Sequence, residues 1–113
     1  MTPGEIYWVV FPPSDGHEQS GRRPAIILQD ARYGERLSVV LVAPVTGSLA
    51  NTRFAATVQV SPTEENGLYA ESVILVFQIR AMDRTRFGKR IGFVTPEVLA
   101  QVYKELDKLT GRP

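Results

Sequence analysis

Short apolar runs fill most of this 113-residue chain, and only one stretch, close to the C-terminus, has the period of a helix. Glycine, proline and asparagine residues separate the runs, which are rich in β-branched and aromatic residues, as is typical of strands. The expected strands are residues 5–11, 24–30, 38–45, 54–60, 71–83 and 90–94. Several short strands followed by one helix predict a mainly β fold, a small and strongly bent antiparallel barrel with the helix packed on it.

Two of the runs also predict which side chains face the core. Residues 54–60 alternate between apolar and polar side chains, so one face should point inward. The expected inward residues are Phe54, Ala56, Val58 and Val60. Residues 71–83 are expected to form one long strand whose odd positions, 73–81, are all apolar and stay in the core. Its even positions become polar at Gln78 and Arg80, so that end of the other face should meet water or charge.

The expected helix has recognisable start and stop signals. Thr95 is a favourable N-cap, Pro96 suits the first helical position, and Glu97 suits the positive end of the helix dipole. Gly111 can end the helix in a left-handed conformation. The apolar stripe consists of Val98, Leu99, Val102, Leu106 and Leu109.

Length and composition limit the class of protein. The length is that of one domain, taken as residues 1–113. The absence of cysteine excludes disulfides and thiolate sites and fits a reducing cytosol. The N-terminal segment lacks the features of a signal peptide, and no window approaches the ~18 apolar residues that cross a membrane. We therefore expect a soluble, cytoplasmic protein.

The charge distribution is more informative than the net charge, which is +1 at pH 7. Four basic residues crowd into the segment DRTRFGKR: Arg84, Arg86, Lys89 and Arg90. The planar guanidinium fork suits bidentate contact with phosphate or carboxylate. The segment is either a surface that attracts a polyanion or a solvated turn, and its composition allows both interpretations.

A hairpin register predicts that two distant segments meet. Residues 24–30 and 38–45 flank a connection centred on Gly34 and Glu35. If the register is symmetric about that centre, paired positions add up to 69. Arg23 would then lie opposite Thr46 at the open end of the hairpin, with their Cβ atoms ~4.5–5.5 Å apart. A slip by one residue would instead move Thr46 to the other face.

The segment GHEQSGRRP, residues 16–24, concentrates polar groups between two expected strands. With one histidine and no cysteine, the chain offers no ligand cluster of the usual metal-site type. It also contains neither a G-x-S-x-G elbow nor a phosphate-binding G-x-x-x-x-G-K-[ST] loop. The remaining arginine, threonine, carboxylate and amide groups suit phosphoryl transfer on RNA, which supplies its own 2′-hydroxyl nucleophile.

Four segments in this order make the chain resemble the MazF/PemK (Kid-like) toxins of bacterial toxin–antitoxin systems. They are GEIYWVVF, GHEQSGRRPAIILQ, VAPVTGS and GLYAESVILVFQIRAMD, and they span Gly4 to about Asp83. The resemblance implies an SH3-like barrel assembled as a homodimer. It also implies metal-independent, sequence-specific cleavage of single-stranded RNA without a cofactor, leaving 2′,3′-cyclic phosphate and 5′-hydroxyl ends. A cognate antitoxin whose flexible tail occupies the RNA groove is the implied partner.

The resemblance also places functional residues. Arg23 and Thr46 match the family's essential arginine and threonine. Because arginine stays protonated at neutral pH, we expect Arg23 mainly to stabilise charge and Glu18 to be the candidate proton acceptor. The candidate RNA-binding residues are Gln19, Arg22, Gln78, Arg80, Arg84 and Arg86. Arg22 occupies a variable position in such loops, so the target sequence does not follow from the resemblance.

Two other functions fit a barrel of this size. A gyrase-poisoning toxin of the CcdB type would share the fold but need no Arg23–Thr46 pairing. A peptide-binding barrel would show clustered aromatic residues in its loops, whereas the aromatic residues here fall mostly on expected strands. Trp8 is one of these and is expected in the core.

Overall fold

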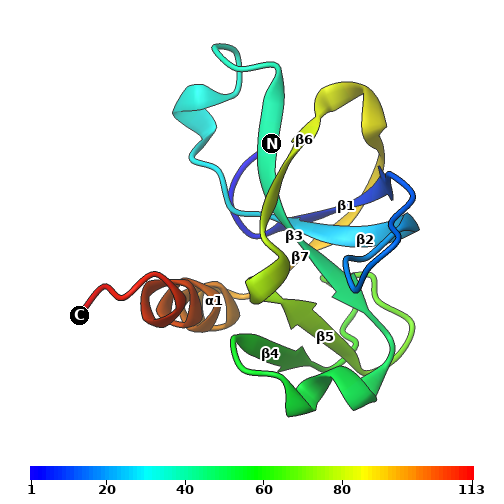
Figure 1. Ribbon diagram of the computed structural model, residues 1–113. Helices are drawn as coiled ribbons and strands as arrows, with labels where there is room; N and C mark the ends of the chain where they lie inside the picture. The colour runs from blue at the N-terminus through cyan, green and yellow to red at the C-terminus, as the bar shows by residue number, and fades with distance from the viewer.

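The computed structural model describes residues 1–113 as seven antiparallel strands and one C-terminal helix (Figure 1). The strands are β1 (Glu5–Phe11), β2 (Gly21–Ile27), β3 (Val39–Thr46), β4 (Thr57–Val60), β5 (Ser72–Leu75), β6 (Arg80–Asp83) and β7 (Phe87–Phe93). The helix α1 is Pro96–Leu109, and four 3₁₀ turns, η1 (Ala31–Tyr33), η2 (Leu49–Arg53), η3 (Val76–Gln78) and η4 (Arg84–Arg86), join strands. The mainly β class with one terminal helix is therefore confirmed.

The predicted hairpin register between β2 and β3 is confirmed. The observed pairs are Ala25 with Pro44, Ile26 with Ala43 and Ile27 with Val42, and each pair adds up to 69. The connection between the two strands is longer than a tight turn, because η1 and the residues around it lie between them. Extending the register by two positions places Arg23 across from Thr46, on the same face of the two strands.

The expected long strand over 71–83 is wrong, because η3 divides it into β5 and β6. Both parts pair with β3, since Val45 pairs with Ile74 and Val42 pairs with Arg80. From the first pair to the second, β3 goes back by three residues, whereas the partner chain goes forward by six. Three extra residues must therefore leave the ladder between the two pairs, and they form the 3₁₀ turn. The bend lets one central strand, β3, belong to both halves of the barrel.

The same insertion overturns the prediction that the odd face of 71–83 stays in the core. Val73 and Leu75 are fully buried, but Ala81 is exposed and Met82 is buried in its place. Side chains in a strand alternate with period two, so an insertion of three residues exchanges the two faces.

The alternation predicted for residues 54–60 holds only in part. Ala56, Val58 and Val60 are buried, as expected, but Phe54 is 43% exposed. Ala56 has a φ of 58°, a left-handed conformation that turns the chain just before β4 begins at Thr57. Phe54 therefore lies before β4, and the strand alternation predicted for residues 54–60 does not apply to it.

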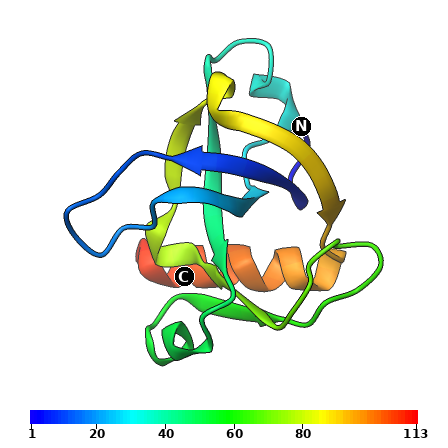
Figure 2. The ribbon, with the colours of Figure 1, turned by 90° about the vertical axis from the view of Figure 1, so that its right-hand side faces the viewer.

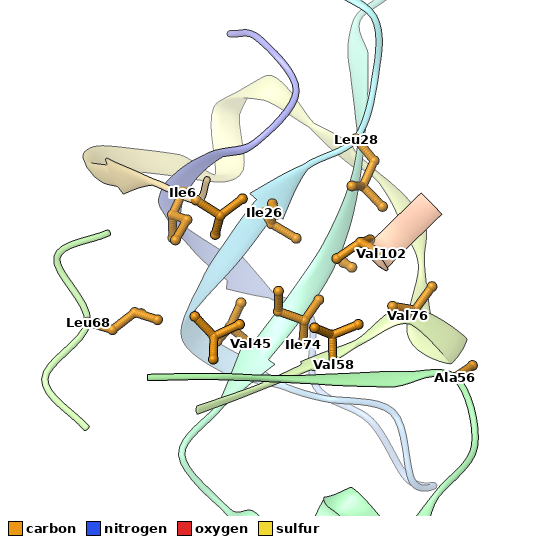
Figure 3. Packing of buried hydrophobic residues seen from close by; sticks show 13 residues of the cluster. Ile6, Ile26, Leu28, Val45, Ala56, Val58, Leu68, Ile74, Val76 and Val102 are labelled. Atoms are coloured by element: carbon orange, nitrogen blue, oxygen red, sulfur yellow. The ribbon is translucent and has the colours of Figure 1, made fainter. Parts of the chain in front are cut away.

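The core consists of two apolar clusters on opposite faces of β1, β2 and β3. The larger one is shown in Figure 3, where Ile26 and Val45 of the central strands meet Val58 and Ile74 of the outer ones, and Val102 of α1 adds the helix. The smaller cluster consists of Val9, Phe11, Ala25, Ile27, Val40, Val42 and Met82. Strands buried on both faces explain why these runs are apolar throughout.

The helix prediction is confirmed at its start and needs one correction near its end. The Thr95 hydroxyl oxygen accepts from the Val98 backbone N–H at 3.2 Å, and Pro96 is the first helical residue. Gly111 follows the helix with a φ of 76°. Leu109 is 48% exposed, so the apolar stripe ends at Leu106. This helix is too short and too polar to cross a membrane.

The sheet is open between its edge strands β4 and β7, and a loop bridges the opening. The β7 strand extends over residues 87–93, so it is longer than the predicted 90–94 and takes in half of the basic segment. Its Phe93 N–H donates to the Glu65 carbonyl at 2.9 Å. The buried Asn66 side chain shapes the loop, since its oxygen accepts from the N–H groups of Thr63 and Leu68. The barrel is thus completed by loop backbone rather than by a strand pair.

Replacing Gly92 by alanine is expected to lower the free energy of unfolding by about 1–3 kcal/mol. A Cβ on Gly92 would overlap backbone atoms of Glu65 and Asn66. Backbone atoms, unlike the end of a flexible side chain, cannot move aside without shifting the loop. Urea unfolding followed by circular dichroism measures the change. Gly47→Ala is the matched control, because open space surrounds Gly47, and it should stay within about 0.5 kcal/mol of the parent. Equal unfolding midpoints for both variants would contradict the packing of this loop on β7.

Candidate functional site

The loop between β1 and β2 is held to the sheet by one glutamine. The Gln78 side-chain oxygen accepts from the Gln19 backbone N–H at 2.7 Å, and its NH₂ group donates to the His17 carbonyl at 3.0 Å. Both ends of the amide are therefore committed to the loop. Figure 2 shows this loop projecting from the molecule on the side where η2 also lies. Gln78 was predicted to contact RNA, and the structure also gives it a positioning function.

Arg23 keeps part of its guanidinium free. It is half-buried on β2, next to Gly21 and Arg22, and its Nε donates to the Ser20 carbonyl at 2.8 Å. Its two terminal nitrogens form no hydrogen bond or ion pair within the protein. A guanidinium fixed at Nε in this way presents its remaining N–H groups in a defined direction, which suits an incoming phosphate.

Thr46 ends β3 and is only 5% exposed. Its hydroxyl oxygen accepts from the Ser48 backbone N–H at 3.2 Å, so the hydroxyl hydrogen remains available to an acceptor. Continuing the β2–β3 register two positions beyond the last observed pair, Ala25 with Pro44, puts Thr46 across from Arg23. Arg23 and Thr46 thus each keep a donor group with no partner in the protein, one cationic and one neutral.

Glu18 is fully exposed in the loop. Its carboxylate accepts from the Ser14 hydroxyl at 2.8 Å. Hydrogen bonds from its own backbone N–H and from Ser14, with a smaller contribution from the charge of Arg80, hold the pKa of Glu18 below its usual value. The carboxylate is thus ionised at neutral pH and can accept a proton. It forms no hydrogen bond with Arg23 or Thr46, so the structure does not bring this predicted residue into contact with either of them.

Arg22 and Arg80 are held over aromatic rings. The Arg22 guanidinium lies 4.2 Å from the centre of the Trp8 ring, and that of Arg80 lies 5.8 Å from the Phe11 ring. Arg22 follows the alternation of β2 and faces away from Arg23. Trp8 is half-buried beneath Arg22, so the prediction that Trp8 belongs to the core is wrong.

Arg84 occupies a different part of the molecule from Arg23 and Thr46. The Arg84 guanidinium donates to the carbonyls of Gly34 and Leu37, which ties it to the β2–β3 connection. Its neighbour Asp83 pairs with Val39, at the opposite end of β3 from Thr46. Seven residues of strand separate the two ends, about 23 Å at ~3.3 Å per residue. Arg84 is therefore remote from Thr46. Arg86 is exposed, and its guanidinium donates to the carbonyl of Val10, the β1 residue that pairs with Arg22.

Comparison with known proteins gives the family. A family model described as "PemK-like, MazF-like toxin of type II toxin-antitoxin system" matches residues 2–110. The chain belongs to this family. The endoribonuclease toxin ChpB of Escherichia coli (strain K12) is 37% identical over 91% of this chain and 88% of its own length.

Solved structures with the same fold include MazF of Deinococcus radiodurans. Its crystal structure has 31% sequence identity and a TM-score of 0.82, and the match covers 98% of this chain and 96% of MazF. A MazE–MazF crystal structure (Form-II) from the same organism matches at 31% identity with a TM-score of 0.77, over 100% of this chain and 97% of that one.

Sequence reasoning missed a pocket beside the loop of this PemK/MazF-type chain. The pocket has a volume of about 390 Å³ and is lined by His17, Asn51, Arg53, Phe54, Phe77 and Gln78. These residues come from the loop, from η2 and from η3, three segments that no local pattern connects. The one available signal was Phe54, an aromatic residue at the start of an expected strand that the structure leaves exposed.

Replacing Gln78 by alanine is expected to accelerate hydrogen exchange at the Gln19 amide and its loop neighbours, since both loop-anchoring bonds are lost. Each such bond contributes about 0.5–1.5 kcal/mol. Gln78→Glu keeps an acceptor for the Gln19 N–H but cannot donate to His17, so its effect should be intermediate. Gln59→Ala, at an exposed glutamine on β4, is the matched control. Unchanged exchange in Gln78→Ala would show that other contacts order the loop.

Proposed function

We propose that this chain is the endoribonuclease toxin of a type II toxin–antitoxin pair and cleaves single-stranded RNA sequence-specifically without a metal ion. The observation that carries the proposal is the β2–β3 register, since continuing it two positions past Ala25 and Pro44 puts Arg23 opposite Thr46, and both residues keep free donor groups. The family match and the endoribonuclease name of ChpB support the same activity. An RNA substrate of this kind is met in the cytoplasm.

In the proposed reaction, the RNA 2′-oxygen attacks the adjacent phosphorus, and the bond from phosphorus to the 5′-oxygen breaks. The products are a 2′,3′-cyclic phosphate and a 5′-hydroxyl, so the 2′-hydroxyl loses a proton and the 5′-oxygen gains one. The Arg23 terminal N–H groups and the Thr46 hydroxyl donate to the non-bridging oxygens, where negative charge grows in the transition state. Glu18 is the proposed acceptor of the 2′-hydroxyl proton, and solvent water supplies the proton that the 5′-oxygen gains.

We propose that the remaining predicted residues bind the RNA rather than react with it. Gln19 and Arg80 lie on the loop and on the strand beside it, and Gln78 holds the loop in place. Arg22 offers a guanidinium backed by Trp8. Arg86, whose guanidinium contacts the β1 partner of Arg22, is a further RNA contact, and Arg84 would act through its charge alone on a more distant part of a longer RNA.

The proposed partners are a second copy of the chain and a cognate antitoxin with a flexible tail. The MazE–MazF structures of Deinococcus radiodurans, which share the fold at 31% identity, support an antitoxin of this kind. A tail that folds on binding can cover an extended surface and exclude RNA from it.

Cleavage of a long mixed-sequence RNA in EDTA tests the activity. The wild-type chain should give discrete fragments with 5′-hydroxyl ends. Thr46→Val removes the hydroxyl but keeps the shape, and we expect a loss of about 10²-fold or more in kcat. Thr46→Ser restores the donor and should recover most of the rate. Arg23→Lys keeps the charge without the fork and should fall between wild type and Arg23→Ala.

Intact RNA in the presence of a folded wild-type chain would contradict the proposal. Circular dichroism establishes folding in the same samples. Arrest of DNA replication on expression, without RNA fragments, would then favour the gyrase-poisoning function instead.

The acidic limb of the cleavage rate should lie at a lower pH than an ordinary glutamate base would give. The reason is that hydrogen bonds lower the pKa of Glu18, so its carboxylate remains unprotonated at a lower pH than usual. Ser14→Ala removes one of these bonds and should shift the acidic limb of the kcat/KM profile to higher pH. Glu18→Gln should lower the rate by about 10²-fold or more. A Glu18→Gln variant of wild-type rate would exclude Glu18 as the base.

A further inference from the structure

We propose that Gly21 is a positioning residue for the proposed catalytic Arg23, because its left-handed backbone turns the Ser20 carbonyl toward the Arg23 side chain. The inference rests on the proposed ribonuclease function and deepens it. It assigns a task to the one glycine of the segment EQSGRRP, residues 18–24, whose other polar groups already have proposed functions.

Gly21 has a backbone conformation that other residues rarely adopt. It is the first residue of β2, and its φ is 80°. Glycine reaches a positive φ of this size without a steric penalty, whereas a Cβ makes it costly. Its partner in the ladder is Phe11, the last residue of β1. The left-handed conformation therefore occurs at the point where the loop passes into the strand.

The sign of this φ decides where the Ser20 carbonyl points. The angle describes rotation about the bond from the Gly21 nitrogen to its Cα, and the planar peptide group that holds the Ser20 carbonyl turns with it. With β2 held in place, an ordinary strand φ of roughly −140° to −120° would turn this group by roughly 140–160°. The carbonyl oxygen, which lies 2.8 Å from the Arg23 Nε, would then face away from it.

The contact with the Ser20 carbonyl is the one hydrogen bond that the Arg23 side chain forms within the protein. A free arginine side chain samples many rotamers and must lose that freedom when it meets the phosphate. A guanidinium already fixed at its Nε keeps its terminal N–H groups aimed before the substrate arrives. The backbone conformation of Gly21 should therefore act on the rate of the chemical step through Arg23.

The requirement for glycine at this position is conformational and not steric. A Cβ built on Gly21 meets no atom within 4 Å. At Gly67 and Gly92, in contrast, a Cβ would overlap backbone atoms of neighbouring segments. A small side chain would thus fit at position 21, and the effect of a substitution there comes from the change in φ.

Gly21→Val tests the assignment, because a β-branched residue strongly disfavours a positive φ. With the Ser20 carbonyl turned away, kcat should fall by about 5- to 30-fold, the factor that corresponds to the cost of a left-handed conformation. KM should change little, since the charge of Arg23 is kept. Gly21→Asn should recover most of the rate, because asparagine tolerates the left-handed region.

The same substitution in an Arg23→Ala background separates positioning from a general effect on the loop. If Gly21 acts through Arg23, Gly21→Val should lower the residual rate of Arg23→Ala no further. An equal fold-loss in both backgrounds would mean that the glycine only shapes the loop, and it would overturn the inference.

Gly111→Val is the matched control. Gly111 has a φ of 76° and open space around it, as Gly21 has, but it follows α1. This variant should keep the wild-type kcat. Thermal unfolding establishes that each variant folds, and Gly21→Ala takes the place of Gly21→Val if valine prevents folding.

Hydrogen exchange at the Arg23 Nε–H, followed by NMR, gives a readout that needs no cleavage. Wild type and Gly111→Val should protect this hydrogen. In Gly21→Val it should exchange as fast as the Nε–H of the exposed Arg36.

Wild-type kcat in a folded Gly21→Val chain would overturn the inference while the ribonuclease function stands. If wild type cleaves no RNA, the proposed function is overturned, and hydrogen exchange decides the positioning by itself. Loss of protection in Gly21→Val would then still support it, and unchanged protection would overturn both proposals.

Discussion

The pairing of β3 with its three neighbours is the interaction on which the rest of this structure depends. On one side β3 pairs with β2, and on the other it pairs first with β6 and then with β5. Its side chains enter both apolar clusters, Val40 and Val42 on one face and Ala43 and Val45 on the other. The strand also carries Thr46 at its end, so the packing of the core and the position of a proposed catalytic hydroxyl are set by one ladder.

Polar groups in the molecule divide into those that hold the structure and those that remain free. The side chains of Gln78, Arg84 and Asn66 form hydrogen bonds with backbone groups of loops. The terminal nitrogens of Arg23 and the side-chain oxygen of Asn51 remain unpaired. Arg23 lies beyond the last observed β2–β3 pair, Ala25 with Pro44, where the ladder between these two strands has ended. The free Arg23 nitrogens make the open end of the hairpin the place where we propose that RNA binds.

Several features could be predicted because they depend on local rules. The register of β2 and β3 follows from the symmetry of their connection, and the start of α1 follows from the capping chemistry of Thr95 and Pro96. The break at η3 could not be predicted in this way. Every residue of 71–83 suits an extended strand locally, and the break arises only because β3 pairs with both parts in registers that differ by three residues.

The sequence by itself determined the mainly β class, the terminal helix, the hairpin register and the motifs that mark a PemK/MazF-type toxin. Each of these depends on residues close together in the chain or on the alternation of a single strand. Only the tertiary structure decided that Gln78 anchors the loop, that Arg84 is far from the Arg23–Thr46 pair, and that Asn51 and Phe54 line a pocket. These relations join segments brought together by the bend at η3 and the turn at Ala56, and that geometry results from pairing and packing of the whole sheet.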